Sequence, residues 1–436
     1  MKSNNNLISS MIDKCSVYVQ LEDIKRKLIP IYSFSLLFFI LIFIFGPSPS
    51  SGDTNSNFSA GSILASGKLD AVRTPLYPLI LNFFKFTLRN NFALKFGIII
   101  FQYLIFCISI YCFYRVCEYF IKHKGIAFFV VMYYACHPAI LVWHKIIMTE
   151  SLALSGIIFW IYFIVKFLMT KETVYSLFIN LFLFLLVMLR PGFIFLVPIG
   201  MFFWLFSILK RVKKGWIGLG LNIFVILIIT IYSLNFKNQF GVFSISTVSD
   251  INQYMILRDA GLIDTNKIEN LKIKNTLNEY IQKKKTISEY YDEYIYLYTQ
   301  FGYPLSHKFI QESVKGDFPK YMTYNIKRFI NQTTDSKIGY WNSFSYNKYY
   351  PLIKHICFSF ILLYIFLIFY FIILIKNKLH TKPSIFIYSI AISSILIFII
   401  GSPDAWGRLV VPTIPILLIM IGQSLNYLRL KIIVVR

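Results

Sequence analysis

Acidic residues are scarce in this sequence, and several common catalytic signatures are missing from it. Its 436 residues hold 20 Asp and Glu against 44 Lys and Arg, which gives a formal net charge of +24. No C-x-x-C, H-E-x-x-H or Walker-type glycine loop is present. Zinc-ribbon, metalloprotease and P-loop chemistry therefore lack their usual residues.

Cysteines are few, and they do not form a disulfide framework. There are six in the chain, most of them within apolar runs, and the long polar stretch 235–350 contains none. Disulfide-stapled secreted domains distribute their cysteines through polar loops. We therefore expect no structural disulfides.

Apolar residues are abundant instead, and they form long runs. Hydrophobic residues make up 57% of the chain, whereas soluble proteins have about 45–50%. Runs of about 18 or more apolar residues predict transmembrane helices. We expect an all-α polytopic membrane protein with ten such helices, at 28–46, 93–120, 126–142, 149–168, 174–190, 191–209, 215–234, 351–375, 384–401 and 409–427.

Basic clusters mark one side of these predicted helices. With the N-terminus inside, every short inside loop is basic, as at Lys25–Lys27 and Lys210–Lys214, which agrees with the positive-inside rule. This reading explains the net charge without nucleic acid. It places both termini in the cytoplasm and predicts an integral protein of a bacterial inner membrane.

The same topology divides the chain into four parts. They are a cytoplasmic segment 1–27, a transmembrane core 28–234 with a first outer loop 47–92, an extracytoplasmic subdomain 235–350, and C-terminal helices 351–436. Within the first outer loop, the apolar segment Leu79–Leu88 is too short to span and is expected to lie along the membrane surface.

Charged residues gather on the predicted outer face, and such residues near a membrane often mark a site. They are Asp53, Asp70 with Arg73, Lys145 with Glu150, Arg190, and Arg408. Each has a structural alternative. The aspartates suit turns, Glu150 suits a helix N-terminus, and Lys145 and Arg190 suit the membrane interface.

Tyrosines are frequent in the 235–350 stretch. Tyr290, Tyr291, Tyr294, Tyr296 and Tyr298 lie close together there. Such aromatic residues could stack on sugar rings, or they could form the core of the subdomain itself.

Four of these pieces together resemble GT-C glycosyltransferases, the polytopic enzymes related to aminoarabinose transferases and protein O-mannosyltransferases. The run from Asp53 to Arg73-Thr-Pro-Leu-Tyr-Pro78 is similar to the family's first outer loop. His137-Pro138 followed by Thr149-Glu150, then Leu189-Arg190-Pro191, then Arg408 with its following prolines, resemble later motifs in the same order. One departure is Leu409, where the family often has a tyrosine.

The resemblance implies a GT-C-like fold with surface-lying helices and a polyprenyl phosphate sugar as donor. The acceptor would be a lipid, a glycan or a protein, and transfer would invert the anomeric centre. Asp53 would be the general base, and Glu150 would orient the acceptor, a cation or one of the basic residues. Arg408, Arg190 and Lys145 would bind the donor phosphate. Asp70 and Arg73 would shape the loop. No cofactor is required, and a divalent cation stays open.

Two other functions use similar parts. An O-antigen-type polymerase also combines many spans with a large outer loop and a lipid-linked sugar, but needs no aspartate near its first span. A lipid-linked saccharide flippase or other transporter would place charges in mid-span and often show repeat symmetry.

Overall fold

The structure, a computed structural model, is helical throughout the part of the chain that it describes. It describes residues 26–50, 52–212, 214–263, 265, 271–282, 287–334, 388–393 and 411–435. No strand occurs among these residues. The expected all-α class is therefore confirmed for them.

The helices follow one another with short connections. After a helix at Arg26–Phe45, they are α2 (Gly52–Ala65), α3 (Leu76–Thr87), α4 (Asn91–Phe120), α5 (Lys124–Cys136), α6 (Pro138–Lys145), α7 (Thr149–Thr170), α8 (Thr173–Leu189), η1 (Pro191–Phe195), α9 (Leu196–Leu209), α10 (Gly215–Phe240), α11 (Val248–Asp259), α12 (Leu271–Gln282), α13 (Ile287–Phe301), α14 (Tyr303–Gly316), α15 (Phe318–Thr334), η4 (Val411–Thr413) and α20 (Ile414–Val435).

Five helices in the described part are long and apolar enough to cross a membrane. They are Arg26–Phe45, Asn91–Phe120, Thr149–Thr170, Pro191–Leu209 and Gly215–Phe240. The pair α5 and α6 would add a sixth span, bent by 43°. The structure thus supports five or six spans where ten are expected.

The remaining expected spans differ in their status. α8 is apolar but has only 17 residues, and the described apolar part of α20, Ile414–Tyr427, is similarly short. The expected span 351–375 and most of 384–401 lie outside the described residues.

Two prolines explain where the helices break. The expected helix 126–142 is interrupted because Pro138 lacks an N–H and instead starts α6 at its first position. Arg190 has an extended backbone (φ −150°, ψ 128°) between α8 and η1, as a residue before proline usually does. The predicted boundary between Arg190 and Pro191 is therefore confirmed.

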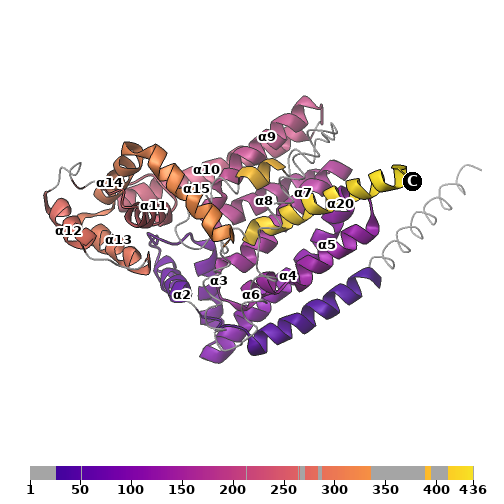
Figure 1. Cartoon of the computed structure of the whole chain (residues 1–436), viewed down its shortest axis with the longest axis horizontal. Coiled ribbons are helices and arrows are strands. Elements are labelled where there is room, and N and C mark those ends of the chain that lie inside the picture. The colour runs from indigo at the N-terminus through magenta and orange to yellow at the C-terminus, as the bar shows by residue number, and fades with distance from the viewer. Residues whose placement is uncertain are drawn as a thin grey trace, which may run out of the picture.

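The long helices form the body of the molecule. Figure 1 shows α4, α5, α7, α8 and α20 running beside one another, with α9 and α10 along one edge. A single large apolar cluster joins them, and its fully buried members include Trp143, Trp160 and Trp204.

Residues 47–92, which the sequence predicts to be the first outer loop, contain the helices α2 and α3. α3 buries Tyr77, Pro78 and Leu81, while Phe83 and Phe86 are exposed. The apolar segment after Pro78 is thus helical and two-faced, as expected for a helix at a membrane surface. Its orientation in a membrane is still a prediction.

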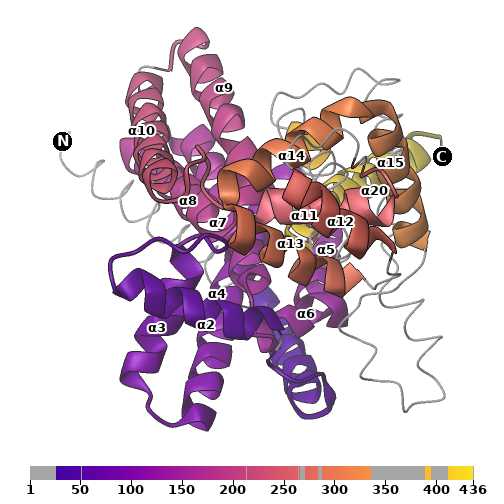
Figure 2. The same cartoon turned by 90° about the vertical axis from the view of Figure 1, so that its left-hand side faces the viewer.

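Helices α11 to α15 form a separate small unit, which we call the α11–α15 unit. It has its own apolar cluster, with Tyr254, Tyr290, Tyr294 and Tyr321 among its buried members. The tyrosines at 290 and 294 therefore belong to a core, which favours that reading over sugar stacking for these two. The unit gathers at one end of the molecule (Figure 1), and Figure 2 shows α2 near it.

Candidate active site at the first outer loop

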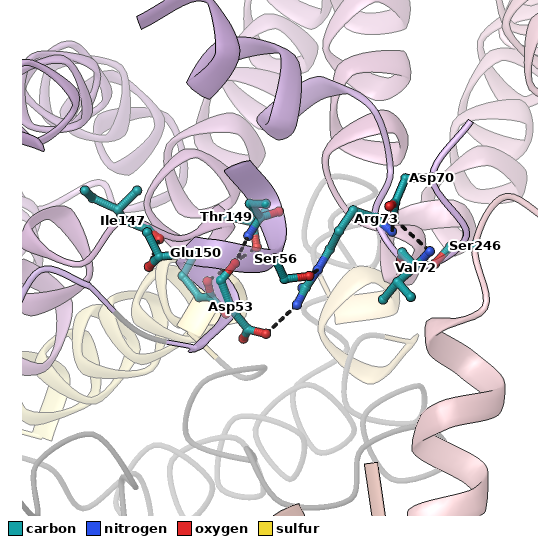
Figure 3. Close-up of polar contacts among 11 residues, drawn as sticks. Asp53, Ser56, Asp70, Val72, Arg73, Ile147, Thr149, Glu150 and Ser246 are labelled. Atoms are coloured by element: carbon teal, nitrogen blue, oxygen red, sulfur yellow. Dashed lines mark hydrogen bonds and ion pairs between the residues drawn. The ribbon is translucent and has the colours of Figure 1, made fainter. Parts of the chain in front are cut away.

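Asp53 and Arg73 meet although they come from different ends of the first outer loop. Asp53 lies in the first turn of α2, where a carboxylate interacts favourably with the helix dipole. The guanidinium of Arg73 donates a hydrogen bond to Asp53 Oδ1 and forms an ion pair with it. The Arg73 Nε also donates to Ser56 Oγ, at 3.1 Å, one turn further along α2. Figure 3 shows Arg73 reaching from its loop toward Asp53 and Ser56.

Exposure distinguishes the two partners of this pair. The Asp53 side chain is 25% exposed and that of Arg73 is 16% exposed. An adjacent guanidinium favours the charged form of a carboxylate. Asp53 is therefore a partly accessible carboxylate whose orientation is set by its bond to Arg73.

Asp70 organises the turn from which Arg73 projects. Its Oδ1 accepts hydrogen bonds from the backbone N–H groups of Val72, at 2.9 Å, and Arg73, at 2.6 Å. Such bonds to nearby backbone are the usual way in which aspartate stabilises a turn. The carboxylate of Asp70 is thus used within the loop.

A second pair joins Glu150 and Arg190. Glu150 lies in the first turn of α7, after Met148, which gives no side-chain cap. Its side chain is fully buried, and Oε1 lies 3.5 Å from Arg190 Nη1. Thr149 Oγ1 donates to the other carboxylate oxygen, at 3.3 Å. A buried carboxylate needs such a counter-charge to offset its desolvation.

Backbone and hydroxyl contacts tie the first loop to the start of α7. Thr54 Oγ1, in the first turn of α2, donates to Ile147 O at 3.0 Å, and Ile147 N donates to Pro49 O at 2.9 Å. Ile147 comes only three positions before Glu150. The two charged pairs therefore belong to one connected region, and Figure 3 shows Asp53, Ile147 and Glu150 of this region near one another.

A buried polar chain supports this region from α4. Gln102 Nε2 donates to two carbonyls of the α6–α7 connection, His144 O at 3.1 Å and Ile146 O at 3.0 Å. Gln102 Oε1 accepts from the hydroxyl of Tyr77, at 2.8 Å. Burial raises the pKa of Tyr77, and the charge of Glu150 acts in the same direction, so the phenol keeps the proton that it donates.

Lys145 has a different position from the other predicted site residues. Its Nζ donates to three carbonyls near the end of the first helix, Ile42 O at 3.1 Å, Phe43 O at 2.9 Å and Gly46 O at 2.9 Å. An ammonium has three N–H donors, so these contacts use all of them. The geometry favours a helix-capping role for Lys145 over phosphate binding.

Arg408, the remaining predicted phosphate ligand, lies outside the described residues. Its role is still a prediction.

Sequence reasoning missed Tyr77, Gln102, Ser56 and Thr54 as site residues. A glutamine inside the apolar run of α4 was the one available signal, because a buried amide requires hydrogen-bond partners. The two hydroxyl residues gave no signal, since short polar side chains are common in loops.

Metal ligands are not grouped in the described part of the chain. No set of three or more His, Cys, Asp or Glu side chains there is arranged to hold a metal ion. The two ion pairs of the candidate site offer one partly accessible carboxylate, one buried carboxylate and two guanidinium groups.

No protein-family model matches the sequence, and no curated protein matches it either.

Proposed function

We propose that this chain is an integral membrane glycosyltransferase that moves a sugar from a polyprenyl phosphate to an acceptor hydroxyl. The observation that supports it most is that two ion pairs, Asp53–Arg73 and Glu150–Arg190, lie in segments bonded to each other. These residues come from three of the segments that resemble GT-C motifs, and contacts through Thr54 and Ile147 connect them. If the resemblance of these segments to the family were accidental, their charged residues would have no reason to lie in segments that are bonded to one another.

The proposed reaction needs a base and a cation. The acceptor O–H transfers its proton to the carboxylate of Asp53 while its oxygen forms a bond to the anomeric carbon. The bond from that carbon to the phosphate oxygen breaks, and the lipid phosphate leaves with the electron pair. General base assistance contributes about 10²–10⁴ in rate, and guanidinium groups stabilise the leaving phosphate.

The residues take their roles from position and charge. Asp53 is partly exposed and suits the base. Arg190 and Arg408 are the proposed phosphate ligands. Glu150 is fully buried, so it orients Arg190 instead of meeting substrate. Arg73 fixes the direction of the Asp53 carboxylate, which is a narrower role than general loop shaping.

The place of the charges favours this proposal over a transporter. Glu150 lies in the first turn of α7 and Arg190 directly follows α8. A transporter that carries a charged substrate would instead be expected to place such groups in mid-span. The pairing of Asp53 also favours it over a polymerase, for which that aspartate has no required function.

Donor turnover tests the proposal directly. Purified protein in lipid nanodiscs is given a panel of polyprenyl phosphate sugars with an acceptor extract, and released polyprenyl phosphate is counted. We expect release by the wild type and a loss of about 10²-fold or more in Asp53→Asn. Asp317→Asn is the matched control, because that aspartate pairs with Lys320 in the α11–α15 unit. Equal release by wild type and Asp53→Asn would remove Asp53 from the mechanism.

A further inference from the structure

The turn that carries Arg73 is bonded to the end of α10 and to the segment that leads into α11. Gln239, near the end of α10, forms a reciprocal amide pair with Leu69. The Leu69 N–H donates to Gln239 Oε1 at 3.0 Å, and Gln239 Nε2 donates to Leu69 O at 3.0 Å. One exposed side chain thus satisfies both backbone groups of Leu69.

Two further bonds follow along the same turn. Ser246 Oγ donates to Val72 O at 2.5 Å, and Thr247 N donates to Ala71 O at 2.8 Å. The Ser246 hydroxyl also accepts from Val248 N, at 3.1 Å, at the start of α11. It is therefore a bridge between the turn and the first helix of the unit. Figure 3 shows Ser246 beside Val72, with Asp70 and Arg73 next to them.

Side-chain packing repeats this connection. Val72 packs against the apolar cluster of the α11–α15 unit, as does Tyr291 of α13. Burial raises the pKa of the Tyr291 phenol, Arg73 lowers it, and Asp53 and Asp70 raise it. The packing of Val72 and Tyr291 against one cluster therefore joins the turn to the core of the unit.

These contacts leave the turn little freedom. Its Leu69, Ala71 and Val72 backbone groups are bonded to the 239–247 segment, while Asp70 bonds the N–H groups of Val72 and Arg73 from within. Arg73 follows directly after these hydrogen-bonded residues. A shift of the unit would therefore move the point from which the guanidinium reaches Asp53.

We propose that Gln239 of α10 and Ser246, two residues before α11, are positioning residues that hold the 69–73 turn, so that the segment joining these two helices sets the placement of Arg73 against Asp53. The mechanical part of this inference stands on geometry alone. Its consequence for catalysis rests on the proposed function: an acceptor that shifts the unit on binding changes the orientation of the base.

Hydrogen exchange of the turn tests the mechanical part without an activity assay. The variants are Gln239→Met, which keeps the side-chain length and removes the amide, and Ser246→Ala. Exchange of the full-length protein in nanodiscs is followed by mass spectrometry for peptides that cover residues 66–76. A net hydrogen bond is worth about 1 kcal/mol, so we expect exchange to be about five- to tenfold faster.

Matched controls are a glutamine and a serine of α14. Gln311→Met and Ser313→Ala change residues whose side chains contact Gln253 and the carbonyl of Phe309. We expect wild-type exchange at 66–76 in both. If Gln239→Met exchanges like the controls, the proposal is overturned. Since Gln239 is exposed, this variant decides the question even if Ser246→Ala does not fold.

Turnover then separates positioning from a general structural effect. We expect Gln239→Met to lower kcat about tenfold with little change in the KM for the donor. Ser246→Thr keeps the hydroxyl, and we expect it to retain the activity that Ser246→Ala loses. If Gln239→Met exchanges faster but keeps the wild-type kcat, the proposed effect of the turn on catalysis is overturned. If amide exchange is faster in the variants while the wild type itself shows no donor turnover, the mechanical link is supported and the proposed function is rejected.

Discussion

The guanidinium of Arg73 is bonded to the carboxylate of Asp53, 20 residues earlier in the chain. The pair closes the first outer loop on itself, with α2 on one side and the Asp70 turn on the other. It also gives the accessible carboxylate of the candidate site a fixed direction.

Replacing Arg73 should reduce turnover more than it reduces stability. Arg73→Lys keeps the charge but cannot bond Ser56 and Asp53 together, because an ammonium lacks the planar fork of guanidinium. We expect donor turnover to fall by about 10-fold in Arg73→Lys and by about 10²-fold in Arg73→Ala. Nanodisc turnover and the thermal midpoint are measured in parallel. Wild-type turnover in Arg73→Ala would contradict the assignment.

Arg190→Met should destabilise the protein because it removes a counter-charge from a fully buried carboxylate. The expected loss is about 3 kcal/mol. Glu150→Gln in the same chain should recover part of it, since no buried charge is then left. Thermal unfolding of the two single variants and the double variant gives the coupling. If the stability losses of the two single variants simply add up in the double variant, the two groups, 3.5 Å apart, contribute no interaction energy.

Lys145→Met separates helix capping from phosphate binding. Three carbonyls near the end of the first helix lose their donor, and bonds to a charged donor contribute about 1.5–3 kcal/mol. We expect a lower thermal midpoint with an unchanged donor KM for the folded fraction. A raised KM with an unchanged midpoint would restore Lys145 as a phosphate ligand.

Alkaline pH should destabilise the α11–α15 unit through its buried phenols. Burial raises the pKa of Tyr321 to about 12, above the value of about 10 for an exposed tyrosine. The neutral phenol therefore stabilises the fold below pH 10, and this contribution is lost as the pH rises toward 12. At pH 11 the loss is about 1 kcal/mol.

Tyr321→Phe removes that titration. We expect the variant to lose less stability than wild type between pH 9 and pH 11, measured as the thermal midpoint. Tyr296→Phe is the control, because Tyr296 is 43% exposed and should behave as wild type. An identical pH profile for wild type and Tyr321→Phe would show that Tyr321 ionises equally in the folded and unfolded chain.

The sequence by itself determined the helical class, the apolar runs and the break at Arg190-Pro191. These features depend on local chemistry: apolar periodicity, the missing N–H of proline and the extended backbone before it. It also indicated the charged residues at 53, 73, 150 and 190, because ionised groups beside long apolar runs are costly and stand out.

Only the tertiary structure decided which of these charges meet. Asp53 pairs with Arg73, Glu150 pairs with Arg190, and Lys145 caps the first helix instead of joining them. Hydrogen-bond partners depend on how helices pack, and no sequence spacing encodes the approach of Gln239 to Leu69 across 170 residues. The attachment of the Arg73 turn to the segment between α10 and α11 is such a long-range result, since its bonds join residues about 170 positions apart in the chain.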